Sequence, residues 1–211
     1  MKLDSPKISP ELSVKSFHDI FYEEDSLLEM CIITDSDFTK EVVNRPRLYN
    51  AVIKNCKFNH SNLNNIDMTD VRFENCDLSN VTMSKSSIHR VEFLNCKLVG
   101  CEFPESSIGN VKFENSLLNL ATFGNSKLEK VLFKNNSIQN VDFYECKLKS
   151  VVFDSCNLNE ANFEETSLKG IDISTSHFDS LVVSLKDLKG CKVSSQQAIQ
   201  FAALMGLIIK E

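Results

Sequence analysis

Residues 101–140 read CEFPESSIGN VKFENSLLNL ATFGNSKLEK VLFKNNSIQN, and every fifth residue from Phe103 onward is Phe, Leu or Ile. The same frame extends in both directions, from Leu28 to Val193, and all 34 of its positions hold Leu, Ile, Val, Met or Phe. A five-residue period fits neither the 3.6 residues of a helical turn nor the alternation of a flat strand. The repeat therefore predicts a chain that turns a corner every five residues.

A second frame lies two residues before the first and holds small side chains. Of its 33 positions from Cys31 to Cys191, 26 are Cys, Ser, Ala, Val or Thr, and all eight cysteines fall in it. The residue between the two frames is usually polar, as in Cys76-Asp77-Leu78. We therefore expect the two frames to point inward and the other three residues of each unit to point outward.

A longer period of 20 residues sorts the apolar frame into columns. Phenylalanine recurs every 20 residues in two columns, and aliphatic residues occupy the columns between them. The aromatic columns are Phe73, Phe93, Phe113, Phe133 and Phe153, and Phe103, Phe123, Phe143 and Phe163. Four five-residue sides that close one coil explain this sorting, because equivalent residues then stack on one another. The sequence thus predicts an all-β fold, a four-sided parallel β-helix of about eight coils.

The ends depart from the repeat, so three segments are expected. Residues 1–27 contain Pro6 and Pro10 and then an apolar stretch, and we interpret them as an N-terminal cap. Residues 28–193 form the β-helix, which needs capped ends because such solenoids bury a core only by stacking. Residues 194–211 form a C-terminal tail. Within the repeat, Glu41 and Pro46 occupy small-residue positions, which predicts an irregular side over 41–50.

The tail predicts a helix over 196–205, with Ser194 or Ser195 as its N-cap and Gly206 just beyond its end. The helix is apolar around much of its circumference, and a short apolar strand is expected over 207–209. Together they present more apolar surface than one coil end can cover, so a second copy should bury the rest and form a homodimer. The expected dimerisation residues are Ile199, Phe201, Ala202, Leu204, Met205, Leu207, Ile208 and Ile209.

Composition excludes several functional classes. The formal net charge of −6 argues against direct nucleic-acid binding, which needs a basic surface. No apolar run is long enough for a membrane span or a signal peptide, so we expect a cytoplasmic protein that does not enter a membrane. Eight cysteines without an export signal indicate reduced thiols.

Catalytic chemistry is not indicated either. Cys56, Cys76 and Cys96 would stack on adjacent coils and invite a metal or redox interpretation, but they lack a CxxC pair and a histidine partner. Filling the core is the simpler interpretation. The four histidines lie outside the inward frames, and no hydrolase triad, phosphate loop or carboxylate pair is present. We expect a non-enzymatic protein without cofactor or metal.

Outward charge is the most informative surface feature. A lengthwise stripe beside the second phenylalanine column carries seven carboxylates and no Lys or Arg over 100–105, 120–125, 140–145 and 160–165. Its members are Glu102, Glu105, Asp142, Glu145, Glu160, Glu164 and Glu165. The next side gathers Lys127, Lys147, Lys149 and Lys169. The stripe is either a solvated face that keeps the rod soluble or a surface that imitates the phosphate rows of duplex DNA.

The repeat resembles the pentapeptide repeat family, whose unit is a small residue, Asp or Asn, Leu or Phe, and two polar residues. The resemblance covers residues 28–193 and implies a right-handed quadrilateral β-helix. The length, the nearly uninterrupted repeat and the ending VSSQQAIQFAALMGLIIKE are similar to the quinolone-resistance subgroup, the Qnr and MfpA type. That likeness implies an end-to-end homodimer that mimics DNA, binds DNA gyrase or topoisomerase IV and protects it from quinolones. The alternative is a non-catalytic scaffold for another protein partner, because a fold does not fix a function.

Overall fold

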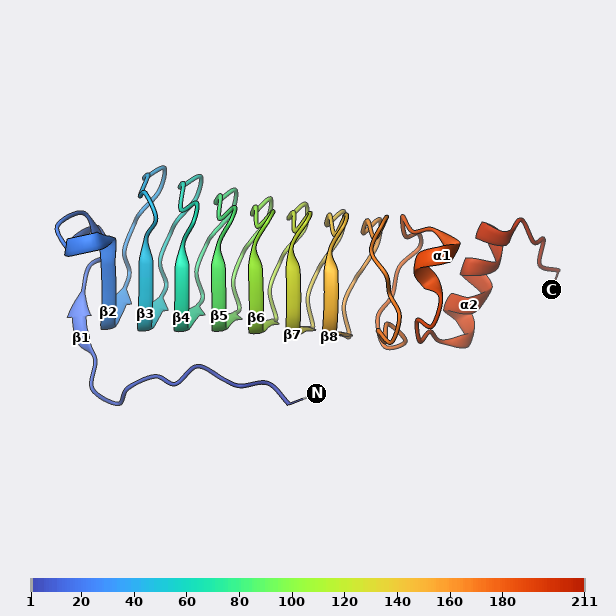
Figure 1. The fold of residues 1–211 in the computed structure, drawn as a ribbon, viewed down its shortest axis with the longest axis horizontal. Coiled ribbons are helices and arrows are strands. Elements are labelled where there is room, and N and C mark those ends of the chain that lie inside the picture. The colour runs from blue at the N-terminus through green and yellow to red at the C-terminus, as the bar shows by residue number, and fades with distance from the viewer. Residues whose placement is uncertain (1, 211) are drawn as a thin grey trace.

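The five-residue repeat folds into a rod of stacked coils (Figure 1), which a computed structural model describes over residues 2–210. Strands of eight residues recur at intervals of 20 and pair in parallel in chain order, so Phe73 lies beside Phe93 and Val71 beside Val91. The strands are β2 (Leu27–Thr34), β3 (Arg47–Lys54), β4 (Asp67–Glu74), β5 (Ser87–Leu94), β6 (Ser107–Glu114), β7 (Lys127–Lys134) and β8 (Lys147–Asp154). This register confirms the predicted parallel β-helix. Beyond β8, single bridges such as Asn157 to His177 continue the stack without a further strand.

The corners fall at every fifth residue, where the backbone enters the left-handed region. Asn55, Asn75 and Asn95 have φ of 53°, 55° and 53°, a conformation that asparagine tolerates better than most residues. Their amides also bond from coil to coil: Asn75 Nδ2 donates to Asn55 Oδ1 at 3.4 Å. The asparagine column is therefore a structural ladder.

The apolar frame fills the core. Every frame residue from Leu28 to Val183 is buried, except for the half-buried Leu148. Rings within a phenylalanine column stack in parallel, as Phe113 and Phe133 do at 5.0 Å and 4°. Rings of neighbouring columns meet edge to face, as Phe123 and Phe133 do at 84°. Both arrangements are favourable for aromatic pairs.

The small frame also supplies buried hydrogen bonds, which its sequence pattern did not indicate. The hydroxyl of Ser126 accepts from the Ser106 N–H at 2.8 Å and donates to the Phe103 carbonyl at 2.8 Å. Thr166 Oγ1 likewise accepts from the Cys146 N–H at 2.8 Å. The small side chains thus pair backbone groups that would otherwise be buried without a partner.

The prediction of an irregular side over 41–50 is wrong. Val42 bridges Asn62, and strand β3 enters in the same register as the later strands. Pro46 is buried and its carbonyl accepts from the Asp67 N–H at 2.9 Å. At the equivalent Ile66 the N–H serves only a local turn bond to Leu63. Elsewhere in this column, as at Ser106, the N–H donates to a hydroxyl of the next coil, but Ile66 offers no such acceptor to residue 46. Proline at this position therefore costs no bond between coils. The Glu41 carboxylate leaves the core and approaches His18 Nε2 at 3.9 Å.

The N-terminal segment divides into two parts. Strand β1 (Ser13–Lys15) extends the sheet beside β2, and the 3-10 helices η1 (Phe17–Phe21) and η2 (Glu24–Ser26) follow it. Phe17 and Ile20 are fully buried on the first coil, whereas Phe21 is 47% exposed. Residues 2–12, called the arm below, do not lie over the coil end and run back along the side of the rod (Figure 1).

The C-terminal end is helical. A short helix α1 (Leu185–Leu188), which the sequence did not predict, precedes α2 (Ser195–Ala202) and η3 (Ala203–Met205). Ser194 is the N-cap, because its hydroxyl accepts from the Gln197 N–H at 3.2 Å. Gly206 has φ of 72° and lets the Leu207 N–H reach the Ala202 carbonyl at 3.2 Å.

The strand expected over 207–209 is not formed. Residues 207–210 have no regular secondary structure, since a strand needs a partner and no neighbouring strand edge reaches this end of the single chain. No helix within residues 2–210 is long and apolar enough to cross a membrane.

Candidate functional site

Most of the acidic stripe lies on one side of the coils and on the corner that ends this side, and Glu160 lies at the corner before it. Parallel bridges align Glu102, Thr122, Asp142 and Asn162 in one row. Glu105, Glu145 and Glu165 occupy one corner column, with φ of 57°, 53° and 54°. Adjacent coils in a parallel sheet are about 4.8 Å apart, so Glu145 and Glu165 are one such step apart and Glu105 is two steps from Glu145. The fold therefore aligns Glu102 with Asp142, and Glu105 with Glu145 and Glu165, in rows parallel to the rod axis, while Glu160 and Glu164 lie beside these rows.

Most of the stripe is open to solvent. Glu102, Glu105, Glu145, Glu160, Glu164 and Glu165 are all exposed. Asp142 is half-buried, and its Oδ1 accepts from Asn162 Nδ2 at 2.8 Å and from the Tyr144 N–H at 3.1 Å. Asp142 is thus fixed in place by the coil, while the six glutamates are available to a partner.

Basic side chains neutralise the stripe only at its edges. Lys85 Nζ lies 3.7 Å from Glu105, and Lys186 Nζ lies 2.7 Å from Glu165. Within residues 2–210, no basic group lies within ion-pair distance of Glu145 or Glu164. The centre of the stripe therefore keeps its negative charge.

Tyr144 stands in the centre of the stripe, and sequence reasoning missed it. The ring is 37% exposed. The Glu145 carboxylate is the main cause that raises the pKa of the Tyr144 hydroxyl, with burial, Glu165 and Glu164 contributing less. Aromatic residues with a polar tip are enriched at protein interfaces. The motif NVDFYE could have indicated this residue, because Tyr144 follows the inward Phe143 and must therefore point outward.

Charge reverses along the same corner column. After Asp25, its members are Arg45, Asn65 and Lys85 toward the N-terminus, and Glu105, Asn125, Glu145 and Glu165 toward the C-terminus. The neighbouring side is basic: Lys127 and Lys147 are exposed partners in the strand register. Lys149 pairs with Glu129 at 2.6 Å. The acidic surface is therefore bounded by positive charge on one side and toward the N-terminus.

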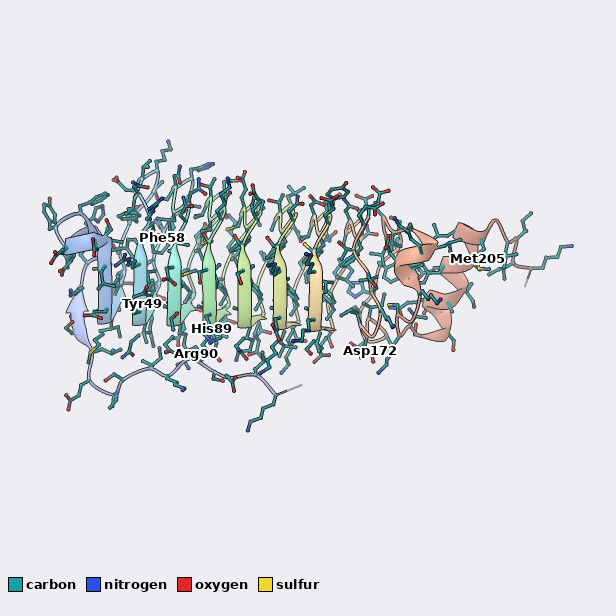
Figure 2. All side chains as sticks on the ribbon, viewed as in Figure 1. Tyr49, Phe58, His89, Arg90, Asp172 and Met205 are labelled. Atoms are coloured by element: carbon teal, nitrogen blue, oxygen red, sulfur yellow. The ribbon has the colours of Figure 1, made fainter. Side chains whose placement is uncertain are left out.

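The C-terminal end exposes apolar side chains (Figure 2, where Met205 is labelled). Of the predicted dimerisation residues, the exposed members are Ile199, Leu204, Met205, Leu207, Ile208 and Ile209. Phe201 instead packs on Phe178 with ring centroids 5.3 Å apart, and Ala202 is half-buried. A hollow of about 280 Å³ lies between α1 and α2, lined by Leu188, Phe201, Met205 and their neighbours.

The thiols lie in the core. Seven of the eight cysteines are buried and Cys191 is half-buried. Burial raises the pKa of Cys146 to about 12 and that of Cys156 to about 11, which keeps these thiols protonated and poorly nucleophilic. No group of three or more metal-ligating side chains occurs within residues 2–210.

Family models match the repeat. A model described as "Pentapeptide repeat region" matches residues 66–143 and 86–163. A model of eight pentapeptide repeats matches residues 47–84. The matches together span residues 47–163, more than half of the chain. No curated protein sequence matches the chain significantly.

Solved structures with the same architecture are similar at low identity. Trypsin-treated QnrB1, described as a plasmid-mediated fluoroquinolone resistance protein, is 19% identical with a TM-score of 0.46, over 88% of this chain and 92% of that chain. Full-length QnrB1 is 17% identical with a TM-score of 0.39, over 83% and 100%. HetL of the cyanobacterium Nostoc, described as involved in heterocyst differentiation regulation, is 12% identical with a TM-score of 0.43, over 80% and 90%. At these values the likenesses assign no function to this chain.

Proposed function

Because this chain belongs to the pentapeptide repeat family, we propose that it acts as a non-catalytic binding protein that mimics DNA. Its partner is a type II topoisomerase, DNA gyrase or topoisomerase IV, which it protects from quinolones. The acidic stripe carries this proposal. Carboxylates at equivalent positions of stacked coils line up along a rigid rod, as phosphates line up along a duplex, and a basic DNA-binding surface would attract them.

The centre of the stripe is the part that a partner would contact. Glu145 and Glu164 are exposed without a basic neighbour, and Tyr144 lies beside them. Carboxylates that are already solvated and unpaired bind a basic partner without first breaking an ion pair. At the two ends of the stripe, the ion pairs of Glu105 with Lys85 and of Glu165 with Lys186 would have to break before a partner binds. We therefore place the contact over the coils that carry residues 142–165.

The active unit would be a homodimer joined through the C-terminal end. Six of the eight predicted dimerisation residues are exposed apolar side chains on one end of the rod. A second copy would cover them and would supply the strand partner that residues 207–209 lack in the single chain. Two rods joined end to end would double the length of the acidic surface.

A gyrase supercoiling assay with and without ciprofloxacin tests the function. The wild-type chain should protect supercoiling activity from the drug, and Glu105→Lys/Glu145→Lys/Glu165→Lys should lose that protection. The matched control is Glu11→Lys/Glu24→Lys/Glu29→Lys, which changes the net charge equally at exposed positions outside the stripe. Binding to gyrase should also weaken steeply with salt, since exposed charges are screened over about 8–10 Å.

Each negative result of these experiments would contradict a different part of the proposal. If the stripe variant protects gyrase as well as the wild type, the mimic surface lies elsewhere on the rod. If the wild type neither binds nor protects gyrase, the protein is a scaffold for another partner. Light scattering at micromolar concentration tests the dimer separately, and a monomeric full-length chain would refute it. Ile208→Ser with Met205→Ser should shift a dimer toward monomer.

A further inference from the structure

The arm contacts the rod through its backbone donors. The N–H of Ser9 donates to Asn50 Oδ1 at 2.7 Å, and the N–H of Lys7 donates to Asp70 Oδ1 at 2.8 Å. The N–H of Asp4 donates to Asn110 Oδ1 at 3.2 Å. The three acceptors all belong to one corner column, whose members are 20 residues apart. We call Asn50, Asp70, Asn110 and Lys130 of this column the corner track.

The donors follow the acceptors in the same order, at spacings close to those of the coils. Asn50 and Asp70 are one coil apart, and Ser9 and Lys7 are two positions apart in the chain. Asp70 and Asn110 are two coils apart, and Lys7 and Asp4 are three positions apart. An extended chain advances about 3.3 Å per residue, and each coil advances the rod by about 4.8 Å. The arm therefore spans about 7 Å between Ser9 and Lys7, along about 5 Å of rod, and about 10 Å between Lys7 and Asp4, along about 10 Å of rod. Because these bonds use backbone N–H groups, an extended peptide can make them with little dependence on the identity of its own side chains.

The coils position the residues that carry the acceptors. Arg90 Nε and Nη2 donate to the two oxygens of Asp70 at 2.6 and 2.8 Å, so the carboxylate is oriented by a forked ion pair. Figure 2 labels Arg90 at the edge of the strands that faces the arm. Asn50 and Asn110 sit at corners with φ of 50° and 54°, where the coil fixes their backbones. The rod itself therefore orients the Asp70 carboxylate and places the backbones of Asn50 and Asn110, independently of the arm.

The arm is bound to the surface and is no part of the core. Leu3, Pro6 and Ile8 are half-buried, and none of residues 2–12 is fully buried. Its one ion pair joins Asp4 to Lys130 at 3.6 Å. Pro10 and Glu11, near the end of the arm that leads to the first coil, are exposed. Lifting the arm therefore breaks a few surface contacts and leaves the coil stack intact.

The track continues past the bonded part of the arm. A hollow of about 270 Å³ lies beside Asn110 and Lys130, with His89 and Lys127 also in its lining. It opens over Gly109, whose neighbours along that row are His89 and Glu129. The missing side chain leaves room for a side chain of a docked segment.

We propose that the corner track is a binding site for an extended peptide, and that the arm is its exchangeable occupant, which a second copy of the chain can supply in trans. Recognition rests on backbone N–H groups spaced two and three residues apart. This site is independent of the acidic stripe and of the C-terminal end.

Proline substitution empties the track without altering it. In the full-length variant Asp4→Pro/Lys7→Pro/Ser9→Pro, the arm loses all three donors while the coils keep every acceptor. A fluorescein-labelled peptide of residues 2–12 is then titrated and its anisotropy measured. It should bind the proline variant at least ten times more tightly than the wild type, whose own arm competes for the site.

Two matched variants test whether the peptide binds at the corner track. Asn50→Ala/Asn110→Ala in the proline variant should abolish peptide binding. Asn55→Ala/Asn115→Ala should leave it unchanged, because these asparagines occupy corners of the same kind away from the arm. Circular dichroism verifies that each variant is folded. The proposal is overturned if the proline variant does not bind at millimolar peptide, if wild type and variant bind equally, or if a peptide with the three prolines binds equally well.

Discussion

The coil stack and the two ends of the chain are held by different kinds of contact. In the stack, each residue lies beside its equivalent 20 positions away, and buried rings, thiols and hydroxyls repeat from coil to coil. The arm is held by three backbone bonds and one ion pair, and the C-terminal end leaves apolar side chains in solvent. Stability therefore resides in the stack, whereas the arm is held by a few surface contacts and the C-terminal end leaves apolar side chains uncovered.

The largest contrast should come from two phenylalanines. Phe123 is fully buried between neighbouring columns, and Phe21 at the N-terminal end is 47% exposed. Phe123→Ala should lower the free energy of unfolding by about 3–5 kcal/mol through lost transfer energy and a cavity. Phe21→Ala should cost less than about 1.5 kcal/mol, because half of its surface is already hydrated. Chemical denaturation measures both, and equal losses would contradict the contrast between stack and end.

A second comparison removes one hydroxyl from the stack. Ser126→Ala leaves the Ser106 N–H buried without its acceptor, which should cost about 1–3 kcal/mol. Ser155 is the control, since it is exposed and its hydroxyl bonds only its neighbour Asp154 within residues 2–210. Ser155→Ala should change stability by less than about 0.5 kcal/mol. Indistinguishable denaturation midpoints for the two variants would show that the interior hydroxyls are dispensable.

The outer face of the stack should respond weakly to pH. Lys112 and Lys134 lie 3.1 and 3.2 Å from the Glu114 carboxylate and hold its pKa below the usual 4.5. A lowered folded-state pKa stabilises the protein above pH 4.5, and that contribution is lost as pH falls through the lowered value. The loss should be about 1 kcal/mol or less. Glu114→Gln should remove this part of the pH dependence, as followed by thermal melting between pH 6 and pH 3.

The smallest effect is expected on the acidic stripe. Glu105→Ala removes one ion pair of 3.7 Å between two exposed side chains, which should leave stability within about 0.5 kcal/mol of the wild type. The same change should weaken gyrase binding if the proposed function holds. A large loss of stability would mean that the stripe supports the coils and is not an open surface.

The sequence by itself determined the coil stack, because each five-residue unit repeats the same pattern of apolar, small and polar residues. Each residue therefore lies beside the equivalent residues of the neighbouring coils. The apolar frame, its aromatic columns and the asparagine corners could all be predicted from positions such as Phe113, Phe133 and Asn75. The alignment and outward position of the acidic stripe followed from the same periodicity.

Only the tertiary structure decided the features that lack a repeating neighbour. Pro46 fits its side because the bond it lacks is local, which no pattern of residue types reveals. Residues 207–209 are not a strand, because pairing depends on a partner outside the segment. Asp142 is tied to Asn162, and Lys186 reaches Glu165 from a helix that the period did not predict. The arm lies along Asn50, Asp70 and Asn110 because three of its N–H groups reach acceptors on successive coils, and those acceptors line up only once the coils are folded.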